Sequence, residues 1–176
     1  MSTAEETFTR VYDAHYDEIH AFCVRRVGRN EADDATAEVF AVVWRRIAEV
    51  GPTSTRGWVF GVARKVVLNQ WRSKSRRARL RDRLVGTATE RSDGPEVVVV
   101  RRSEDEAVLA VLDQLRPMDR EIILLAAWEE LSGPEIGEVL GISTQAAQQR
   151  LHRSKRRLAK RLQSAPGIET REGIHD

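Results

Sequence analysis

Three glutamines and a histidine recur at helical spacing near the C-terminus, and a run of basic residues follows them. Within the segment STQAAQQRLHRSKRRLAKRL, they occupy positions i, i+3, i+4 and i+7, which share one face of a helix: Gln145, Gln148, Gln149 and His152. A glutamine amide can form two hydrogen bonds with the adenine edge in the major groove of DNA. Basic side chains bind phosphates whatever the base sequence. The segment therefore predicts a DNA-binding helix whose glutamines recognise bases and whose basic residues bind phosphates.

A second helix must position that face, and the preceding residues predict one. Ile136, Val139 and Leu140 have helical spacing, Gly141 follows them, and Ser143 is a suitable N-cap for the next helix. That helix would bury Ala147, Leu151 and Leu158. A helix, a short glycine-containing turn and a helix form the helix-turn-helix pattern, whose second helix enters the major groove. The residues expected to contact duplex DNA are Thr144, Gln145, Gln148, Gln149, His152, Arg153, Arg156 and Arg157.

Charge is distributed unevenly along the 176 residues, although the net charge is only +2. Residues 51–85 carry ten basic side chains and one acidic side chain, and residues 136–163 carry seven and one. The segments before each block are acidic, which suggests two modules with a basic edge each. A solvated basic face could explain one block. Two blocks favour a polyanion contacted at two places.

The remaining periodicity predicts an all-α protein. An apolar stripe from Phe8 to Cys23 predicts a first helix, which Gly28 ends, and Asn30 is a candidate cap for the second. Residues 49–57 are expected to form a loop, and Trp58 to begin a third helix that continues into a basic tract. The second helix is expected to bury Val39, Phe40, Val43, Trp44 and Ile47, and the third Val59, Val62 and Val66.

Residues 85–94 lack periodicity and read as a linker. Asp93 and Pro95 predict the start of a further helix, whose apolar spacing is interrupted at Glu104. That helix would bury Val97, Val100, Val108, Val111 and Leu115. The expected organisation is a first domain over 1–79, a linker over 80–94, a second domain over 95–163 and a disordered tail over 164–176.

Several protein classes conflict with the composition. A lone cysteine, Cys23, permits neither an internal disulfide framework nor a thiolate zinc site, so a reducing cytoplasm is expected. The acidic start predicts no signal peptide, and no apolar run approaches the roughly 18 residues of a membrane helix. The four histidines form no HExxH pair, and no glycine-rich phosphate loop is present. We therefore expect no catalytic residues, no metal, no cofactor and no membrane insertion.

Two long segments resemble a known family. LRPMDREIILLAAWEELSGPEIGEVLGISTQAAQQRLHRSKRRL resembles the fourth region of bacterial sigma factors. NEADDATAEVFAVVWRRI, followed by TRGWVFGVARKVVLNQWRSKSRR, resembles their second region. Both regions in this order, without the intervening third region, are typical of extracytoplasmic-function sigma factors. The resemblance covers roughly residues 8–163.

The resemblance implies partners for each part. The second-region helix would dock on the clamp helices of the RNA polymerase β′ subunit through Asp34, Glu38 and Phe40. Asp34 and Glu38 lie about one helical turn apart and can form a joint acidic face, although Asp34 also suits the positive end of the helix dipole. Ala37 departs from the family, in which a glutamine is common at this position. The acidic start of the second domain would face the β flap of the polymerase.

The resemblance also implies two promoter sites: one for a melted −10 strand and one for a −35 element that is bound as duplex. The strand-binding residues would be Ser54, Thr55, Arg56, Trp58, Asn69, Arg72 and Arg76. Unstacked bases need aromatic surfaces and a basic groove. The tryptophans Trp44, Trp58 and Trp71 could provide stacking, but aromatic residues at helical spacing more often belong to a core.

The function implied is that of an alternative sigma factor that is monomeric when free and that an anti-sigma protein holds inactive. One alternative is a stand-alone helix-turn-helix regulator, which would form a homodimer on a palindromic site without polymerase. Another alternative is a protein that sequesters a partner through its acidic helices, but this hypothesis explains neither basic block.

Overall fold

The computed structural model describes residues 3–51, 55–85 and 106–164, and within these ranges the chain is helical and contains no strand. The first domain consists of α1 (Thr3–Val27), α2 (Arg29–Arg45), a 3₁₀ turn η1 (Ile47–Glu49) and α3 (Thr55–Val85). The second consists of α4 (Glu106–Asp113), α5 (Pro117–Ala127), α6 (Gly133–Leu140) and α7 (Thr144–Ser164). The predicted all-α fold class is confirmed.

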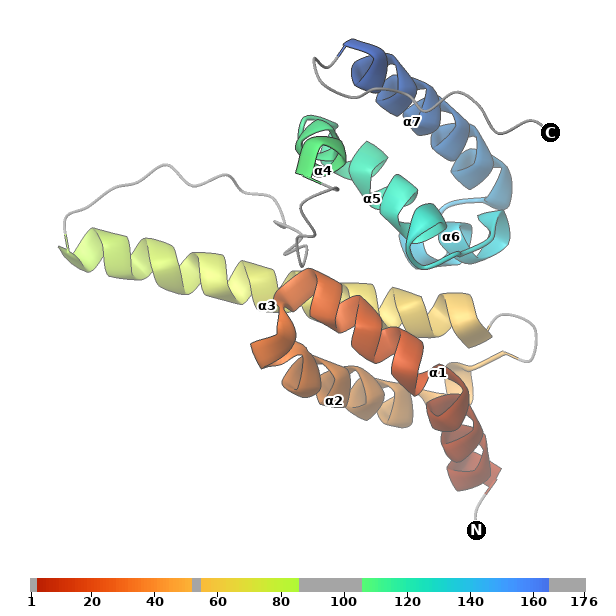
Figure 1. Ribbon diagram of the computed structural model, residues 1–176. Helices are drawn as coiled ribbons and strands as arrows, with labels where there is room; N and C mark the ends of the chain where they lie inside the picture. The colour runs from red at the N-terminus through yellow and green to blue at the C-terminus, as the bar shows by residue number, and fades with distance from the viewer. Residues whose placement is uncertain (1–2, 52–54, 86–105, 165–176) are drawn as a thin grey trace.

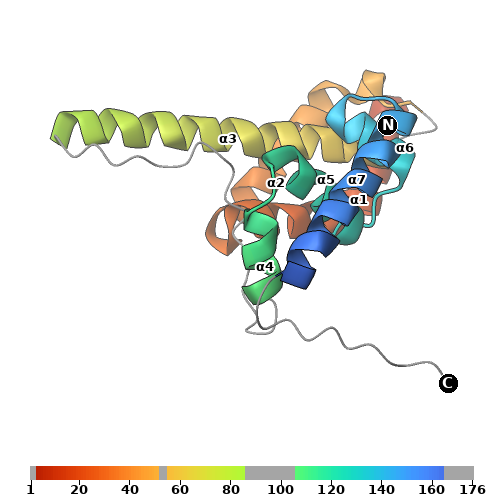
Figure 2. The same cartoon turned by 90° about the horizontal axis from the view of Figure 1, so that it is seen from above.

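The long helix α3 organises the molecule. Figure 1 shows α1 and α2 lying against its first half, while its second half projects beyond them. The second domain lies on the other side of α1 from α2, and α6 approaches the start of α3. Figure 2 shows the same projection of α3 from above. No helix within the described ranges is long and apolar enough to cross a membrane.

Gly28 forms the turn between α1 and α2. Its φ of 84° lies in the left-handed region, which glycine adopts without steric cost. Gly28 is also the N-cap of α2, so the prediction of Asn30 as cap was wrong. The left-handed glycine completes the turn within one residue, and Asn30 therefore already lies inside the helix.

The core of the first domain contains the predicted apolar stripe. Ile19 and Phe22 of α1 pack with Val43 of α2 and Phe60 of α3, and all four are at most 1% exposed. Trp44 does not belong to this core, contrary to the prediction, because 45% of its surface is exposed. It lies at the rim, where its ring meets that of Phe8 edge to face at 5.2 Å. The side chain of Ile47 is likewise only half-buried, since the chain enters the 3₁₀ turn there.

Helix α3 extends beyond its predicted limits at both ends. It begins at Thr55 rather than Trp58 and ends at Val85, so residues 80–85 of the expected linker are helical. The threonine hydroxyl donates a hydrogen bond to the carbonyl of Gly51 at 3.3 Å, which ties the first turn to the preceding loop. Ser54, Asp93, Pro95, Val97, Val100 and Glu104 lie outside the described residues, as does the tail from 165 onward.

The second domain contains the predicted helix-turn-helix. Ser132 and Glu135 form a capping box at the start of α6, and Gly141 ends that helix with a φ of 66°. The Ser143 hydroxyl accepts a hydrogen bond from the Ala146 amide at 3.2 Å, which confirms it as the cap of α7. The turn is tight, because a Cβ at Gly137 would lie 2.9 Å from the carbonyl oxygen of Ile142.

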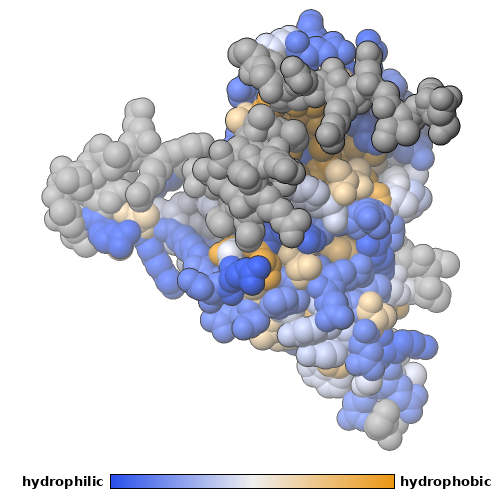
Figure 3. All heavy atoms as spheres, in the orientation of Figure 1, coloured by the Kyte–Doolittle hydropathy of each residue, from blue (hydrophilic) through white to orange (hydrophobic). Residues whose placement is uncertain are grey.

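The core of the second domain contains residues of α4 to α7. Val111 and Leu115 are buried, as predicted. Ile122, Leu124 and Ile136 are at most 1% exposed. Figure 3 shows hydrophilic residues around the free end of α3 and a hydrophobic area on the visible face of the second domain. Buried residues of the two domains belong to one continuous cluster, so α4 to α7 pack on the first domain as well as on one another.

Candidate nucleic-acid interface

The glutamine face of α7 is exposed over its whole length. Gln145, Gln148, Gln149 and His152 are all exposed, and the last three line a shallow hollow with Arg153. The opposite side of the helix is anchored in the domain. Ala147 is 1% exposed, and the fully buried Ser154 donates a hydrogen bond to Asp119 of α5 at 2.9 Å. These anchors hold α7 so that its amides point outward as a group.

Gln148 is the glutamine that contacts the neighbouring helix. A Cβ built at Gly133 would lie 2.9 Å from the Gln148 Cγ atom, so the glutamine side chain passes directly over the start of α6. Its amide is therefore supported by the first helix of the helix-turn-helix rather than extended freely into solvent. Support of this kind lowers the entropy lost when the amide pairs with a base.

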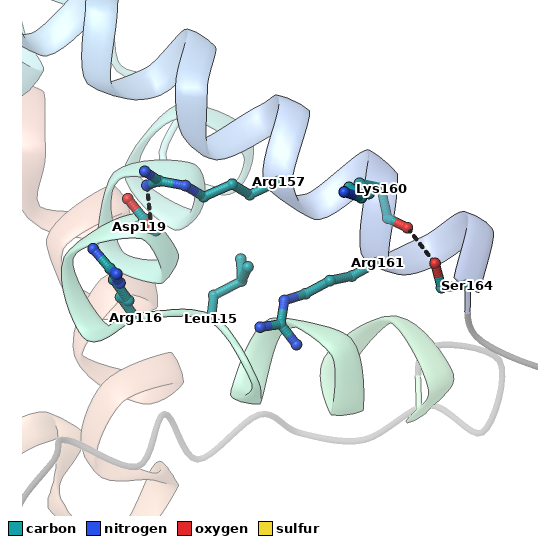
Figure 4. Close-up of a pocket in the computed structure, with 7 residues that line it drawn as sticks. All are labelled: Leu115, Arg116, Asp119, Arg157, Lys160, Arg161 and Ser164. Carbon is teal, nitrogen blue, oxygen red and sulfur yellow. Dashed lines mark hydrogen bonds and ion pairs between the residues drawn. The ribbon is translucent and has the colours of Figure 1, made fainter.

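The basic side of α7 borders a hollow of about 400 Å³ beside α5. Figure 4 shows four cationic side chains around it, with Leu115 and Asp119 between them: Arg116, Arg157, Lys160 and Arg161. Arg157 is ion-paired with Asp119 at 2.7 Å, and Arg161 donates to Gln114 at 3.1 Å. Arg153 donates to the Gln149 carbonyl of its own helix, while Arg156 is exposed. Thr144 is exposed at the first turn.

Part of the predicted strand-binding set forms a second exposed face on α3. Asn69, Arg72 and Arg76 are exposed and lie at i, i+3 and i+7. Trp58 and Trp71 are half-buried and pack against the core, in agreement with the more common role of aromatic residues at this spacing. The Arg46 guanidinium also covers the Trp58 ring at 5.6 Å. Thr55 is half-buried at the start of the helix.

Arg56 does not face open solvent. Its guanidinium donates hydrogen bonds to the Glu18 carboxylate at 2.9 Å and to the Glu129 carbonyl at 2.7 Å, and it lies over the Phe60 ring. Burial lowers the pKa of Arg56, but hydrogen bonding and charge attraction from Glu18 and Glu135 raise it further than burial lowers it. The structure thus separates Arg56 from Asn69 and the arginines that follow it.

The acidic pair of α2 is exposed, as the predicted polymerase contact requires. Asp34 and Glu38 are both exposed, and Gln70 of α3 donates a hydrogen bond to Glu38 at 2.7 Å. Phe40 is only 4% exposed, because its ring packs with Tyr12 and its neighbours at the α1–α2 contact. It therefore positions α2 from inside and does not present its ring to a partner. Ala37 is exposed between the two acidic residues.

Sequence reasoning missed a group of charged residues between the domains. Arg25, Arg26 and Arg64 of the first domain pair with Glu121 and Glu129 of the second. The two partners of each pair lie 57 to 104 positions apart in the chain, so no spacing rule connects them. Their only sequence signal is that arginines such as Arg26 fall on otherwise apolar stripes.

Comparisons with known proteins identify the family of this chain. Residues 11–77 match the family Sigma-70 region 2, and residues 105–158 match Sigma-70, region 4. The ECF RNA polymerase sigma factor SigL of Mycobacterium tuberculosis is 30% identical over 170 residues, which cover 92% of this chain and 93% of SigL. This chain is an extracytoplasmic-function sigma factor.

Other members of the family are similar along most of the chain. SigW of Bacillus subtilis is 27% identical over 168 residues, which cover 90% of each chain. Among solved structures, CnrH in complex with the cytosolic domain of CnrY aligns with a TM-score of 0.60 at 21% identity, over 92% of this chain and 95% of that one. The sigma factor RpoE of Bartonella quintana, in complex with the anti-sigma factor NepR, gives 0.59 at 17%, over 89% and 96%. The chain is therefore an alternative sigma factor, a regulatory protein that directs transcription initiation.

Proposed function

We propose that this sigma factor reads a −35 promoter element as duplex DNA through the glutamine face of α7 and grips a melted −10 strand along α3. The observation that carries the proposal is the exposed glutamine face, held outward by the buried Ala147 and Ser154 on the opposite side of the helix. The two basic faces on α3 and α7 supply the phosphate contacts that such a reader needs.

The two halves of α7 have different roles in this proposal. Gln145, Gln148 and Gln149 lie at the end of the helix that enters the major groove, where their amides can pair with base edges. Arg153 and Arg156 follow on the same side and bind phosphates, which fixes the register without adding sequence information. Arg157 would first have to leave Asp119, so its contribution to DNA binding depends on breaking that ion pair.

The strand-binding role falls on the exposed part of α3. Asn69 can hydrogen-bond an unstacked base, while Arg72 and Arg76 follow the backbone phosphates. Trp58 is half-buried, so a base could stack only on the part of the ring that the core leaves exposed. Ser54 before α3, and Thr55 and Arg56 in its first turn, would complete the site.

The acidic face of α2 is the proposed contact with core RNA polymerase. Asp34 and Glu38 present two carboxylates one turn apart, which suits a basic surface such as the β′ clamp helices. The β flap would meet the second domain. The same proposal includes a cytoplasmic location, a monomeric free state and control by an anti-sigma protein. The complex of RpoE with the anti-sigma factor NepR supports the last of these.

A reconstituted transcription assay tests this proposal. The purified protein is added to bacterial core polymerase with a pool of promoter fragments, and we expect transcripts from a defined subset. Asp34→Lys combined with Glu38→Lys should abolish co-elution with core and all transcription. Asp13→Lys, an exposed acidic position on α1, is the matched control and should change neither. Transcription that survives the double reversal would refute the assigned polymerase contact.

A further inference from the structure

Four arginines of the first domain face the second domain across one seam. Arg25 pairs with Glu129, and Arg26 and Arg64 both pair with Glu121, at 2.6 and 3.2 Å. Arg56 completes the row with a 3.4 Å pair to Glu135 and with hydrogen bonds to the backbone carbonyls of the second domain. We call these four arginines the arginine face and the three glutamates opposite them the glutamate face.

The seam buries charges to an unusual degree. The side chains of Arg26 and Glu129 are 5% and 1% exposed, and that of Glu121 is 12% exposed. Buried charges are tolerated only when they are paired, and removing one partner leaves the other with a large desolvation penalty. Burial also raises the pKa of the Glu129 carboxyl above its ordinary value, against the lowering influence of Arg25. The two faces are therefore specific to each other rather than loosely apposed.

Backbone packing beneath the charges makes the contact close. Gly57, in the first turn of α3, is buried against α6, where an added Cβ would lie 3.0 Å from the Glu135 Cα atom and 2.5 Å from the Glu138 Oε2 atom. One turn later, Gly61 approaches Val139, with 3.7 Å between its added Cβ and the Val139 Cα atom. The start of α3 thus meets α6 through glycines that allow the helices to approach.

This contact occupies a residue that the proposed function needs elsewhere. Arg56 lies at the start of α3, where the melted strand would enter, yet its guanidinium is committed to Glu18, Glu135 and two carbonyl oxygens. A phosphate backbone would have to displace these oxygens to reach it. Oxygen ligands from the protein and from a nucleic acid strand therefore compete for the same donor.

We propose that the glutamate face is an internal ligand of the arginine face, which keeps the free protein closed and competes with single-stranded DNA for Arg56. The competition for DNA rests on the proposed function, whereas the closed state does not. Opening separates the two faces and hydrates both, so it is favoured by salt and by an anionic strand that takes the place of the glutamates. The arginine face is thus the surface that binds a polyanion once the domains separate.

A pair of fluorophores on the two domains measures the closed state directly. Ala14 of α1 and Ala159 of α7 are exposed, and their replacement by cysteine provides two labelling positions, while the native Cys23 is fully buried. Arg25→Glu and Glu129→Arg each place like charges at the seam and should lower energy transfer between the labels. The double variant restores opposite charges and should recover the transfer of the parent protein. Equal transfer in all four proteins would overturn the closed state.

A binding measurement then tests the competition. Glu129→Gln removes one carboxylate and leaves the whole arginine face intact, so it should bind a fluorescent single-stranded oligonucleotide more than threefold tighter than the parent, without polymerase. Circular dichroism establishes that the variant is folded. Opened domains with unchanged affinity would refute the competition. Opened, tighter-binding domains whose affinity is insensitive to Arg56→Ala would instead refute the strand-binding role assigned to Arg56 under the proposed function, while the closed state would stand.

Discussion

Replacing Gly57 by alanine should open the two domains without changing any charge. Gly57 is buried between α3 and α6, and the new methyl group would lie 3.0 Å from the Glu135 Cα atom. That distance is shorter than almost all real contacts of this kind, so α6 must move away or the domains must part. The effect arises only when the domains are closed, because the atoms that crowd the methyl group belong to the second domain.

Two contributions of opposite sign decide the magnitude. Alanine is about 1 kcal/mol more favourable than glycine in the interior of a helix, and α3 gains this in both the open and the closed protein. Overpacking at a close contact costs about 1–3 kcal/mol, and only the closed protein bears it. The helix term cancels between the two states, so the equilibrium should shift towards the open form by about 5- to 150-fold.

Gly61→Ala is the matched control. It adds the same methyl group to the same helix one turn later, where the nearest atom of the second domain is 3.7 Å away, an ordinary van der Waals distance. The labelled pair on α1 and α7 should therefore report lower energy transfer for Gly57→Ala and parental transfer for Gly61→Ala. If both alanines left the transfer unchanged, or lowered it equally, the close approach of α3 and α6 would not hold the domains together.

Three further predictions concern stability. Ile136→Ala removes a fully buried side chain of the second domain and should lower the free energy of unfolding by about 2–5 kcal/mol, measured by urea denaturation. Ser132→Ala removes the capping box of α6 and should lower the free energy of unfolding by about 1 kcal/mol in the same assay. Ser143→Ala removes the cap of α7 instead and should give a comparable loss. Burial raises the pKa of the Cys23 thiol to about 11. The unfolded thiol loses its proton first as pH rises, so the parent protein should lose about 2 kcal/mol of stability between pH 9 and 11 that Cys23→Ala does not lose.

The helix-turn-helix could be predicted almost entirely from local sequence. Gly141 and Ser143 act on their own neighbours, as a left-handed helix end and a cap, and Ala147 buries itself by helical spacing alone. Such signals operate within one or two turns, where the backbone geometry is fixed by residue type. The exposure of the glutamine face follows from the same periodicity.

The contacts between the domains could not be predicted, because they depend on long-range packing. The family resemblance assigned Arg56 to the melted strand, and nothing local in the sequence indicates that Glu129 and Glu135 lie opposite it. Trp44 was expected inside from its helical spacing, yet that spacing does not show where the neighbouring helices end, and the Trp44 ring lies at the exposed rim of the core. Phe40 is the opposite case. The family motif assigns it to the polymerase contact, and the motif alone does not indicate that its ring is buried.

Promoter selection by the reconstituted holoenzyme tests the central claim most directly. Core polymerase with the parent protein, with Gln148→Ala or with Arg156→Ala is allowed to select from a library randomised upstream of a fixed −10 region. Losing the paired amide should remove the preference at one −35 position, at a cost of about 1–3 kcal/mol, whereas Arg156→Ala should weaken binding to all sequences alike. Identical sequence preferences for the parent and Gln148→Ala would contradict the assignment of α7 as the reader of duplex DNA.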